Sequence, residues 1–423
     1  MLTLRYITEN VEDVVKRLEK KGFEAKDIVK EVVDLDALRK QTQMQADEAA
    51  AEMNVISKEI GLLFQQGKGA EANAAKEKTH NLKEKLKVLA ERQNELEQKL
   101  TELLCQIPNT PHDTVPEGKS AEDNKVESQG GHMPELPATA LPHWDLAKKY
   151  DLIDFELGVK ISGAGFPVYK GKGARLQRAL VNFFLDEAQK AGYVEVQPPY
   201  VVNAASGYGT GQLPDKEGQM YHIGLDDLYL IPTAEVPVTN IYRDVILDEK
   251  DLPVKNTAYS ACFRREAGSY GKDVRGLNRL HQFDKVEIVR IDKPEHSYES
   301  LQEMVNYVRT LVECLELPWR ILRLCGGDMS FTSALTFDFE VFSAAQKRWL
   351  EVSSVSNFEA YQANRLKCRY RTADKKIQLC HTLNGSALAL PRIVAALLEN
   401  NQTEKGIRIP QVLVPYTGFD LIQ

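Results

Sequence analysis

The stretch Cys262–Glu287, CFRREAGSYGKDVRGLNRLHQFDKVE, predicts a β-strand, a polar loop and a returning strand that begins near His281. An arginine at the end of a strand presents a fixed pair of donors that suits phosphate oxygens. An aromatic ring on the neighbouring strand can offer its face to a purine. This hairpin could therefore hold a nucleotide, although a charged surface hairpin would have a similar composition. Its charged residues and glycines include Arg264, Arg265, Glu266, Gly268, Gly271, Lys272, Asp273, Arg275, Gly276 and Glu287.

The order of these residues resembles a known motif. FRRE, a glycine-rich loop and RLHQFDKVE resemble the second signature motif of class II aminoacyl-tRNA synthetases, and FRREAGSYG…RG…HQFDKVE is similar to seryl-tRNA synthetases. Corresponding stretches run from the N-terminal helical region to Arg392 and beyond, so the resemblance covers nearly the whole chain. It implies an α+β fold, in which an N-terminal antiparallel helical hairpin precedes an antiparallel β-sheet flanked by helices. It also implies ATP-dependent activation of L-serine and its transfer to tRNA(Ser), and to tRNA(Sec) where the host has one.

Length and composition are those of a soluble globular protein of about two or three domains, with 423 residues, 43% hydrophobic and 27% charged. The net charge of −7 means that any RNA contact must come from a local basic surface. The six cysteines lack C-x-x-C pairing, which argues against a zinc cluster or a disulfide scaffold. The sequence contains neither a membrane-spanning apolar run nor a signal-peptide core, so we expect a cytoplasmic protein.

Residues 35–107 carry a coiled-coil pattern. Apolar and small residues recur in alternating steps of four and three, first from Thr42 to Leu63 and then from Ala75 to Ile107. Gln65-Gln-Gly-Lys-Gly-Ala70 interrupts the pattern. The sequence therefore predicts two helices of about 30 residues that form an antiparallel hairpin.

The second of these helices has a basic outer face. A solvated coiled-coil face is the plainer interpretation, because acidic residues dilute the charge. The resemblance implies instead that the hairpin grips the long variable arm of the tRNA, through shape and backbone rather than base edges. The basic residues concerned are Lys76, Lys78, Lys83, Lys85, Lys87 and Arg92.

We predict three parts of the chain: an N-terminal helical tRNA-binding arm over 1–107, a linker rich in Pro, Gly, Asp and Ser over 108–142, and a class II catalytic domain over 143–423. Residues 174–192 should form a helix, and the apolar run 193–202 should lie at a sheet edge because Pro198 and Pro199 interrupt it. This helix and strand resemble the family's first motif, which implies a homodimer.

The resemblance also implies an amino-acid pocket. Residues 207–214 are expected to form a glycine-rich loop, and Ile231-Pro-Thr-Ala-Glu-Val236 follows it. On composition alone neither segment indicates a site. The residues that the resemblance assigns to L-serine are Thr233, Ala234, Glu235, Arg264, Glu287 and Ser386.

Two further motifs complete the expected ATP site. Glu351 and Ser354 lie in EVSSVSN at an expected junction of strand and turn, and a carboxylate with a hydroxyl suits Mg²⁺. Arg392 lies in GSALALPR, in the first turn of an expected helix, and resembles the third motif. Arg264 and Arg392 are the expected catalytic residues. The resemblance assigns to ATP Arg264, Arg265, Glu266, Leu280, His281, Gln282, Phe283, Glu351, Val352, Ser353, Ser354 and Arg392.

The sequence departs from the family at one place. The family reads SN-x-x-DFQARR, whereas this chain has Ala360, Tyr361 and Asn364 at the acid, the phenylalanine and the first arginine. Three alternatives remain open: another class II synthetase, an amino-acid-activating paralogue that loads a carrier protein, and a non-enzymatic coiled-coil protein. The N-terminal hairpin argues against the second alternative. The combination of Arg264, Glu287, Glu351 and Arg392 argues against the third.

Overall fold

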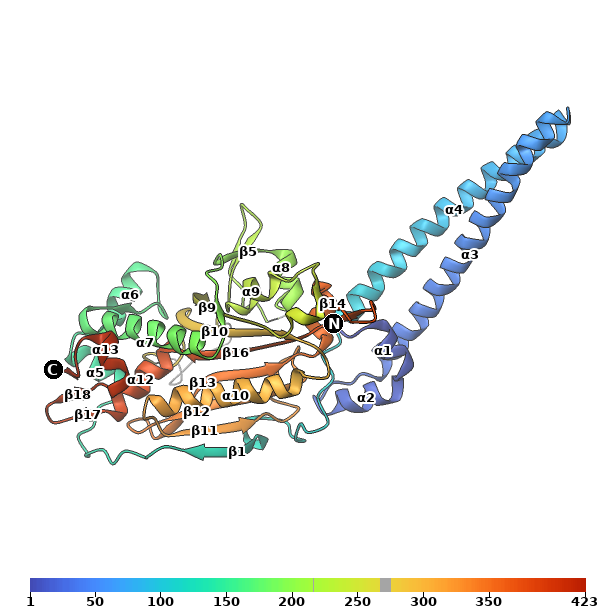
Figure 1. Ribbon diagram of the computed structural model, residues 1–423. Coiled ribbons are helices and arrows are strands. Elements are labelled where there is room, and N and C mark those ends of the chain that lie inside the picture. Colours follow the sequence, from blue (N-terminus) through green and yellow to red (C-terminus); the bar gives the residue numbers. More distant parts are fainter. Residues whose placement is uncertain (216, 267–274) are drawn as a thin grey trace. The chain divides into compact units, whose positions relative to one another are not determined.

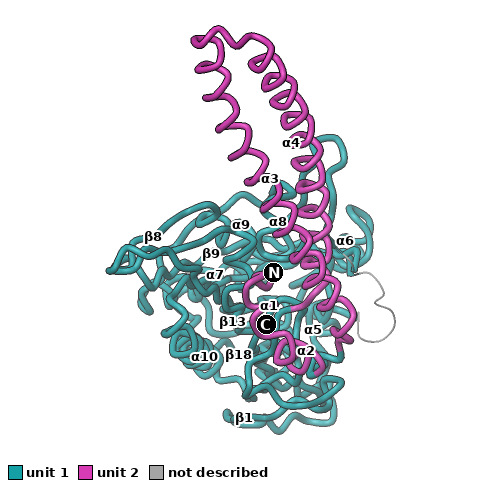
Figure 2. The backbone as a smooth tube through the Cα atoms, turned by 90° about the vertical axis from the view of Figure 1, so that its right-hand side faces the viewer, with its two compact units in different colours: residues 1, 20–22, 109–423 teal, residues 2–19, 23–108 magenta. Residues whose placement is uncertain are grey.

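The computed structural model describes residues 1–215, 217–266 and 275–423 (Figure 1). Four residues of the predicted loop, Gly268, Gly271, Lys272 and Asp273, lie outside the described residues. The chain divides into two compact units (Figure 2). One unit comprises residues 2–19 and 23–108, and the other comprises residue 1, residues 20–22 and residues 109–423.

The N-terminal unit is helical. Two short helices, α1 (Leu4–Glu9) and α2 (Val11–Glu19), precede the long helices α3 (Lys26–Gln65) and α4 (Gly69–Leu104). The long helices pack against each other as the predicted antiparallel hairpin (Figure 2). They are joined at residues 66–68, where Gly67 adopts a φ of +74°. The first long helix begins well before the predicted start near Leu35, because Val29 and Val32 extend its buried face toward the N-terminus.

The predicted seam is confirmed by burial. Leu82, Leu89, Leu96 and Leu100 of α4 are buried, and the other predicted seam positions from Ala75 to Leu103 are half-buried. On α3 the seam is built from smaller residues such as Thr42 and Ala49. Leucines from one helix and small side chains from the other fit together with little empty volume, so this packing stabilises the hairpin.

The second unit is built on an eight-stranded sheet with the order β1-β11-β12-β13-β16-β10-β9-β4. Neighbouring strands are antiparallel except at the edge, where β4 runs parallel to β9. The predicted hairpin forms the neighbouring strands β9 and β10, next to the edge strand β4, with Gln282 paired to Phe263. The strands are β1 (Lys125–Gly130), β4 (Val194–Glu195), β9 (Val254–Phe263), β10 (Gln282–Asp292), β11 (Trp319–Arg323), β12 (Leu335–Ser343), β13 (Arg348–Asn357) and β16 (His381–Ala389).

Helices α7 (Gly171–Lys190), α10 (Ser297–Cys314) and α12 (Leu390–Asn400) pack on one face of this sheet (Figure 1). Val286 and Ile288 of β10 join residues of these helices in the main hydrophobic core. Because side chains alternate along a strand, Lys285 and Glu287 point to the opposite face. The face without the hydrophobic core therefore carries the polar side chains of β10.

The remaining elements surround this framework. Short helices are α5 (His143–Lys149), α6 (Phe155–Ile161), α8 (Ala204–Thr210), α9 (Glu235–Asn240), α11 (Ala360–Leu366) and α13 (Val414–Thr417). Small sheets join β2 (Ile153–Asp154) to β3 (Val168–Tyr169), β5 (Val201–Asn203) to β7 (Leu228–Leu230) and β6 (His222–Ile223), β14 (Arg369–Arg371) to β15 (Ile377–Leu379) and β8 (Ile246–Asp248), and β18 (Gly406–Arg408) to β17 (Gln402–Thr403) and β19 (Leu421–Ile422).

Three local expectations need correction. Residues 204–210 form α8 rather than a glycine-rich loop, because the Asn203 side chain caps the helix and Gly209 allows Leu366 to approach closely. Residues 125–130, inside the expected linker, form the edge strand β1; the boundaries of the three predicted domains stay predictions. Glu351 and Ser354 lie within β13 rather than at its end.

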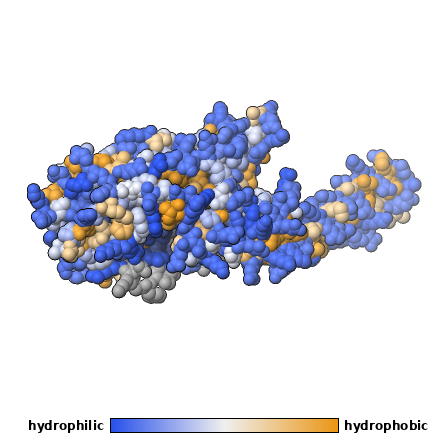
Figure 3. All heavy atoms as spheres, turned by 90° about the horizontal axis from the view of Figure 1, so that it is seen from below, coloured by the Kyte–Doolittle hydropathy of each residue, from blue (hydrophilic) through white to orange (hydrophobic). Residues whose placement is uncertain are grey.

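The surface is mostly hydrophilic on the face shown in Figure 3, with small groups of apolar residues between polar ones. In the parts of the chain that the structure describes, no helix is both long and apolar enough to cross a membrane.

Candidate active site

Two adjoining cavities lie in the second unit. The first has a volume of about 300 Å³ and is bordered by Phe283, residues 277–280 and Arg392. The second has a volume of about 680 Å³ and reaches the buried residues Thr233 and Glu287. The residues that line both cavities are Arg264, Glu266, Arg279, Lys285, Glu351 and Ser386. The side chains predicted for a nucleotide and for an amino acid therefore face connected spaces.

Three arginines border the first cavity, Arg264, Arg279 and Arg392, and backbone carbonyls hold the first and the last in place. The Arg264 guanidinium lies over the Phe283 ring, 5.2 Å from its centroid, and its Nε donates to the Pro232 carbonyl at 3.4 Å. The Arg392 Nε donates to the Asn278 carbonyl at 3.1 Å, and its Nη1 donates to the Glu351 carbonyl at 2.7 Å. These contacts leave further guanidinium donors for an anionic ligand.

A buried ion pair lies at the cavities, with Lys285 lining both and Glu287 lining the second. The Lys285 Nζ lies 2.5 Å from Glu287 Oε2 and donates to Thr233 Oγ1 at 2.8 Å. Glu287 is paired across the sheet with Ser386, which brings strands β10 and β16 together at this point. Lys285 is missing from the residues predicted for the site. The alternation in Lys285-Val-Glu287 could have revealed it, because residues two apart on a strand share a face.

A second buried carboxyl group lies near this pair. Burial of the Glu235 carboxyl, followed by the nearby Glu287 carboxylate, raises its pKa to about 7, although the hydrogen bond from Gln362 acts in the opposite direction. That bond, from Gln362 Nε2 to Glu235 Oε1, measures 2.6 Å, and Thr382 Oγ1 donates to the other side of the same amide at 2.6 Å. Gln362 thus orients Glu235, and nothing in the sequence of α11 indicated this contact.

A β-bulge brings Glu351 and Ser354 to the same face. Residues three apart on a regular strand point in opposite directions. In β13, however, Glu351 pairs with Glu340 and Ser353 pairs with Phe339, so Val352 is an extra residue in the ladder. Ser354 then pairs with Asp338 and donates a hydrogen bond to its carboxylate. Asp338, Glu351 and Ser354 consequently line the second cavity together.

Most of the predicted residues line one or both cavities. The first cavity adds Leu280, Val352 and Ser353 to those described above. Among the described residues, Ala234, Arg265, His281 and Gln282 line neither cavity. His281 contacts Tyr221 and stacks on Phe166 at 5.5 Å, and Arg265 and Gln282 are exposed. Their roles, like those of the lining residues, stay predictions.

Comparison with known proteins identifies both halves of the chain. A family model described as the seryl-tRNA synthetase N-terminal domain matches residues 1–111. A second model, described as the tRNA synthetase class II core domain (G, H, P, S and T), matches residues 222–401.

The relatives extend this match to the full length. Serine–tRNA ligase of Salinibacter ruber is 52% identical and aligns over 99% of this chain and 98% of its own length. That of Chlorobaculum parvum is 46% identical over the whole of both chains. The crystal structure of seryl-tRNA synthetase from Pyrococcus horikoshii complexed with ATP superposes with a TM-score of 0.94 at 34% identity, and covers 100% of this chain and 99% of that chain. The chain therefore belongs to the seryl-tRNA synthetase family.

Proposed function

We propose that the chain joins L-serine to ATP, forming seryl-adenylate and releasing pyrophosphate, and then transfers the seryl group to the 3′ end of tRNA(Ser). The observation that carries this proposal is the position of Arg264 at the junction of the two cavities. A carboxylate held in the second cavity and a phosphate held in the first would meet at this guanidinium. Serylation of tRNA(Sec) is part of the proposal where the host has that tRNA.

In the first step, a serine carboxylate oxygen attacks the α-phosphorus in line, and the bond to the pyrophosphate oxygen breaks. In the second step, the terminal ribose hydroxyl of the tRNA attacks the seryl carbonyl, and AMP leaves. Neither step needs a protein nucleophile. Positioning and charge neutralisation by Arg264 and Arg392 should therefore supply most of the acceleration.

The buried acids suit the serine ammonium and hydroxyl groups. Glu287 and Glu235 face the second cavity, and Thr233 Oγ1 accepts from Lys285 Nζ and from the Glu235 backbone N–H. Lys285 keeps one oxygen of Glu287 occupied, which leaves the other oxygen to accept from a ligand. A pocket arranged in this way is selective, because a ligand without the hydroxyl leaves buried polar atoms unpaired.

The donor set fits Mg²⁺. Asp338, Glu351 and Ser354 offer oxygen atoms on one face of the strand pair. Burial of the Asp338 carboxyl, followed by repulsion from Glu351, raises the Asp338 pKa well above its usual range. Among the described residues, no group of three or more His, Cys, Asp or Glu side chains could hold a metal. Phosphate oxygens would therefore complete the shell of an ion held by Glu351 and Ser354. When bound, Mg²⁺ neutralises phosphate charge.

The helical hairpin is the proposed tRNA-binding surface. Lys76, Lys78, Lys83, Lys85, Lys87 and Arg92 are all exposed on α4. Lys76 also lies over the Phe64 ring at 4.6 Å, within the hairpin. Basic groups on a stiff hairpin suit recognition of an RNA backbone.

A homodimer is proposed from the edge of the main sheet. Among the described residues, strand β4 pairs with β9 alone, and Val194 within it is 64% exposed. The strand consists of Val194 and Glu195 and ends before Pro198 and Pro199, at the sheet edge that the sequence predicts. Sedimentation of the purified protein would test this, and a monomer at micromolar concentration would exclude a stable dimer.

Serine-dependent exchange of pyrophosphate into ATP tests the proposed function. We expect exchange with serine, a roughly 10⁴-fold lower kcat/KM with alanine and a smaller margin against threonine, which only shape excludes. Exchange that prefers threonine or proline would indicate another class II synthetase. Exchange with serine, but transfer to a carrier protein in place of tRNA, would indicate the paralogue.

Glu287→Gln should raise the KM for serine about 10- to 100-fold and leave the KM for ATP within about twofold, because a charged hydrogen bond to the amino acid is lost. Glutamine keeps the shape and avoids leaving Lys285 without any partner. Glu303→Gln is the matched control, since Glu303 pairs at 2.6 Å with Arg290 of the same strand. Normal serine dependence in Glu287→Gln would contradict the assigned pocket.

The raised pKa of Glu235 predicts a pH dependence of serine binding. Below pH 7 its carboxyl group is largely protonated in the free protein, and above pH 7 it is ionised. A bound ammonium favours the ionised form, so the Kd for serine should fall as the pH rises from about 6 to 8. Calorimetric titration should show proton release, and Glu235→Gln should remove the pH dependence. A flat profile in the unaltered protein would count against this role.

A further inference from the structure

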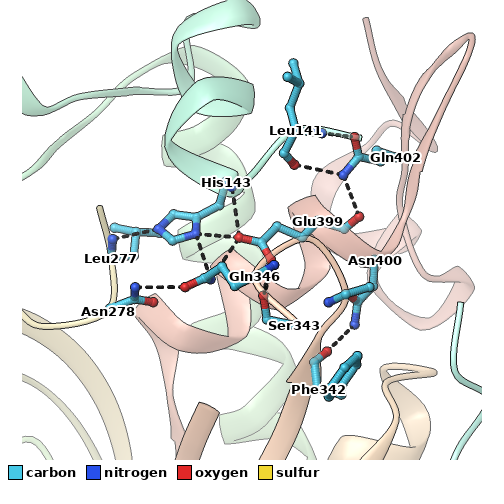
Figure 4. A network of polar contacts seen from close by, with 11 residues as sticks. Leu141, His143, Leu277, Asn278, Phe342, Ser343, Gln346, Glu399, Asn400 and Gln402 are labelled. Atoms are coloured by element: carbon cyan, nitrogen blue, oxygen red, sulfur yellow. Dashed lines mark hydrogen bonds and ion pairs between the residues drawn. The ribbon is translucent and has the colours of Figure 1, made fainter. Parts of the chain in front are cut away.

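Figure 4 shows a buried polar network that includes Leu277 and Asn278. These two residues also line the first cavity. The centre of the network is His143, the first residue of α5, which is fully buried together with Glu399 of α12. His143 lines neither cavity within the described part of the chain, so it cannot act on a substrate directly. Its contacts nevertheless lead to the cavity wall.

The partners of the imidazole define its tautomer. Nε2 lies 2.8 Å from the backbone nitrogen of Leu277, whose N–H is a donor, so Nε2 must accept. Nδ1 lies 2.7 Å from Glu399 Oε1 and 3.4 Å from Gln346 Nε2. The contact with Glu399 is much the shorter, and a carboxylate oxygen can only accept, so Nδ1 carries the proton. The ring is therefore neutral, with its hydrogen on Nδ1.

Both carboxylate oxygens of Glu399 accept hydrogen bonds. Its Oε1 accepts from the His143 backbone N–H at 2.9 Å and from Gln346 Nε2 at 2.9 Å, and its Oε2 accepts from the Ser343 hydroxyl. Burial opposes ionisation of Glu399, but its interactions with His143, followed by the hydrogen bond from Ser343, outweigh burial and lower the Glu399 pKa. An ionised carboxylate can only accept, so it fixes the proton of His143 on Nδ1.

The other side of the imidazole fixes the cavity wall. Its close packing leaves no room for a side chain at position 276, because a Cβ on Gly276 would lie 2.2 Å from His143 Nε2. The next two residues, Leu277 and Asn278, line the first cavity. The Asn278 side chain donates to Gln346 at 3.0 Å, and its carbonyl accepts from Arg392 Nε at 3.1 Å. One continuous series of contacts therefore runs from Glu399 through His143 to Arg392.

We propose that His143 is a positioning residue for the adenylation step. Glu399 holds it as a single neutral tautomer, its Nε2 fixes the backbone at Leu277, and the adjoining Asn278 carbonyl holds Arg392 in the cavity. This role rests on the proposed function, because it concerns how the nucleotide site is kept in shape. The role should concern ATP and not serine, because the contacts of Thr233, Glu235 and Glu287 do not pass through this network.

Two substitutions of His143 differ in which contact they can keep. In His143→Asn the amide can donate to Glu399 as Nδ1 does, but it is too short to reach Leu277. In His143→Gln the longer side chain can place its oxygen near the Leu277 N–H. We expect the KM for ATP in pyrophosphate exchange to rise about tenfold in His143→Asn and about threefold or less in His143→Gln, with the KM for serine unchanged within twofold.

Gln402→Ala is the matched control for stability. Gln402 bonds to the Leu141 backbone and the Glu399 carbonyl but not to the imidazole, so its loss should lower the Tm without changing the KM for ATP. Nitrogen-15 NMR of labelled histidine gives a readout independent of activity. We expect the His143 ring to be protonated at Nδ1 alone in the unaltered protein, and to lose that single form in Glu399→Gln, whose amide can donate to Nδ1.

A normal KM for ATP in His143→Asn, or a ring protonated at Nε2 in the unaltered protein, would overturn the inference. A parallel rise in the KM for serine would also overturn it, because that result indicates general damage. If the unaltered protein shows no serine-dependent exchange, the proposed function fails. The NMR result would then still decide the tautomer.

Discussion

Arg392→Ala and Arg264→Ala should each reduce serine-dependent pyrophosphate exchange by about 10²- to 10³-fold. Each guanidinium faces the first cavity and is held by carbonyl groups, so it is already oriented when ATP binds. Removing one oriented charged donor from a site that develops negative charge typically costs about 2–4 kcal/mol. Single-turnover formation of the adenylate would show whether the loss lies in the chemical step.

Two further variants show what the arginine substitutions remove: Arg264→Lys keeps the charge, and Arg408→Ala is a control outside the cavities. Lysine keeps the positive charge of Arg264 but loses its planar pair of donors, so we expect it to recover only part of the rate. Arg408 forms a half-exposed ion pair with Glu316 and should tolerate alanine with nearly full activity. Exchange within fivefold of normal in Arg264→Ala or Arg392→Ala would remove that residue from the mechanism.

Replacing residues 40–100 by a short Gly-Ser turn should separate the two steps. Every residue proposed to bind ATP or serine lies beyond residue 230, so exchange should stay within about threefold of normal. Transfer to tRNA should fall by about 10³-fold or more, because the proposed RNA contacts all lie on α4. Aminoacylation kcat/KM, measured beside exchange, gives both values on one preparation.

Charge substitution in the intact hairpin provides a milder version of this test. Changing Lys76, Lys78, Lys83, Lys85, Lys87 and Arg92 to glutamine should weaken tRNA binding and flatten its dependence on salt concentration. Exposed Lys347, Lys367, Lys375 and Lys376 form a control set in the other unit. If the deletion or the glutamine set charges tRNA normally, the hairpin is not the RNA-binding surface.

Periodicity and turn chemistry predicted much of the fold. The seam from Thr42 to Leu103 and the hairpin of β9 and β10 are both present, because burial of one face leaves a regular pattern in the sequence. The pattern missed β1 and α8. A polar, exposed edge strand carries little alternation, and α8 depends on the Asn203 cap and on tertiary contacts of its glycines.

The sequence predicted less of the candidate site than of the fold. Motif resemblance supplied Arg264, Glu287 and Arg392, but a motif does not say which side chains support its members. Gln362 and Asp338 reach the site from other elements, through contacts that depend on the folded chain. The bulge at Val352 likewise depends on the pairing of two strands, and no local feature of the β13 sequence predicts it.

The buried chain of contacts from Thr233 through Lys285 to Glu287 limits how this pocket could acquire a new amino acid. Changing Glu287 to an apolar residue leaves the buried Lys285 ammonium without its carboxylate partner. Changing Lys285 alone leaves the buried carboxylate without its ammonium partner. Removing one partner of such a pair costs about 3–5 kcal/mol, a large part of the stability of an ordinary domain. Neutral drift through single replacements is therefore blocked at these positions. A laboratory library that varies residues 233, 285 and 287 together should reach altered specificities that one-at-a-time mutagenesis would discard as misfolded.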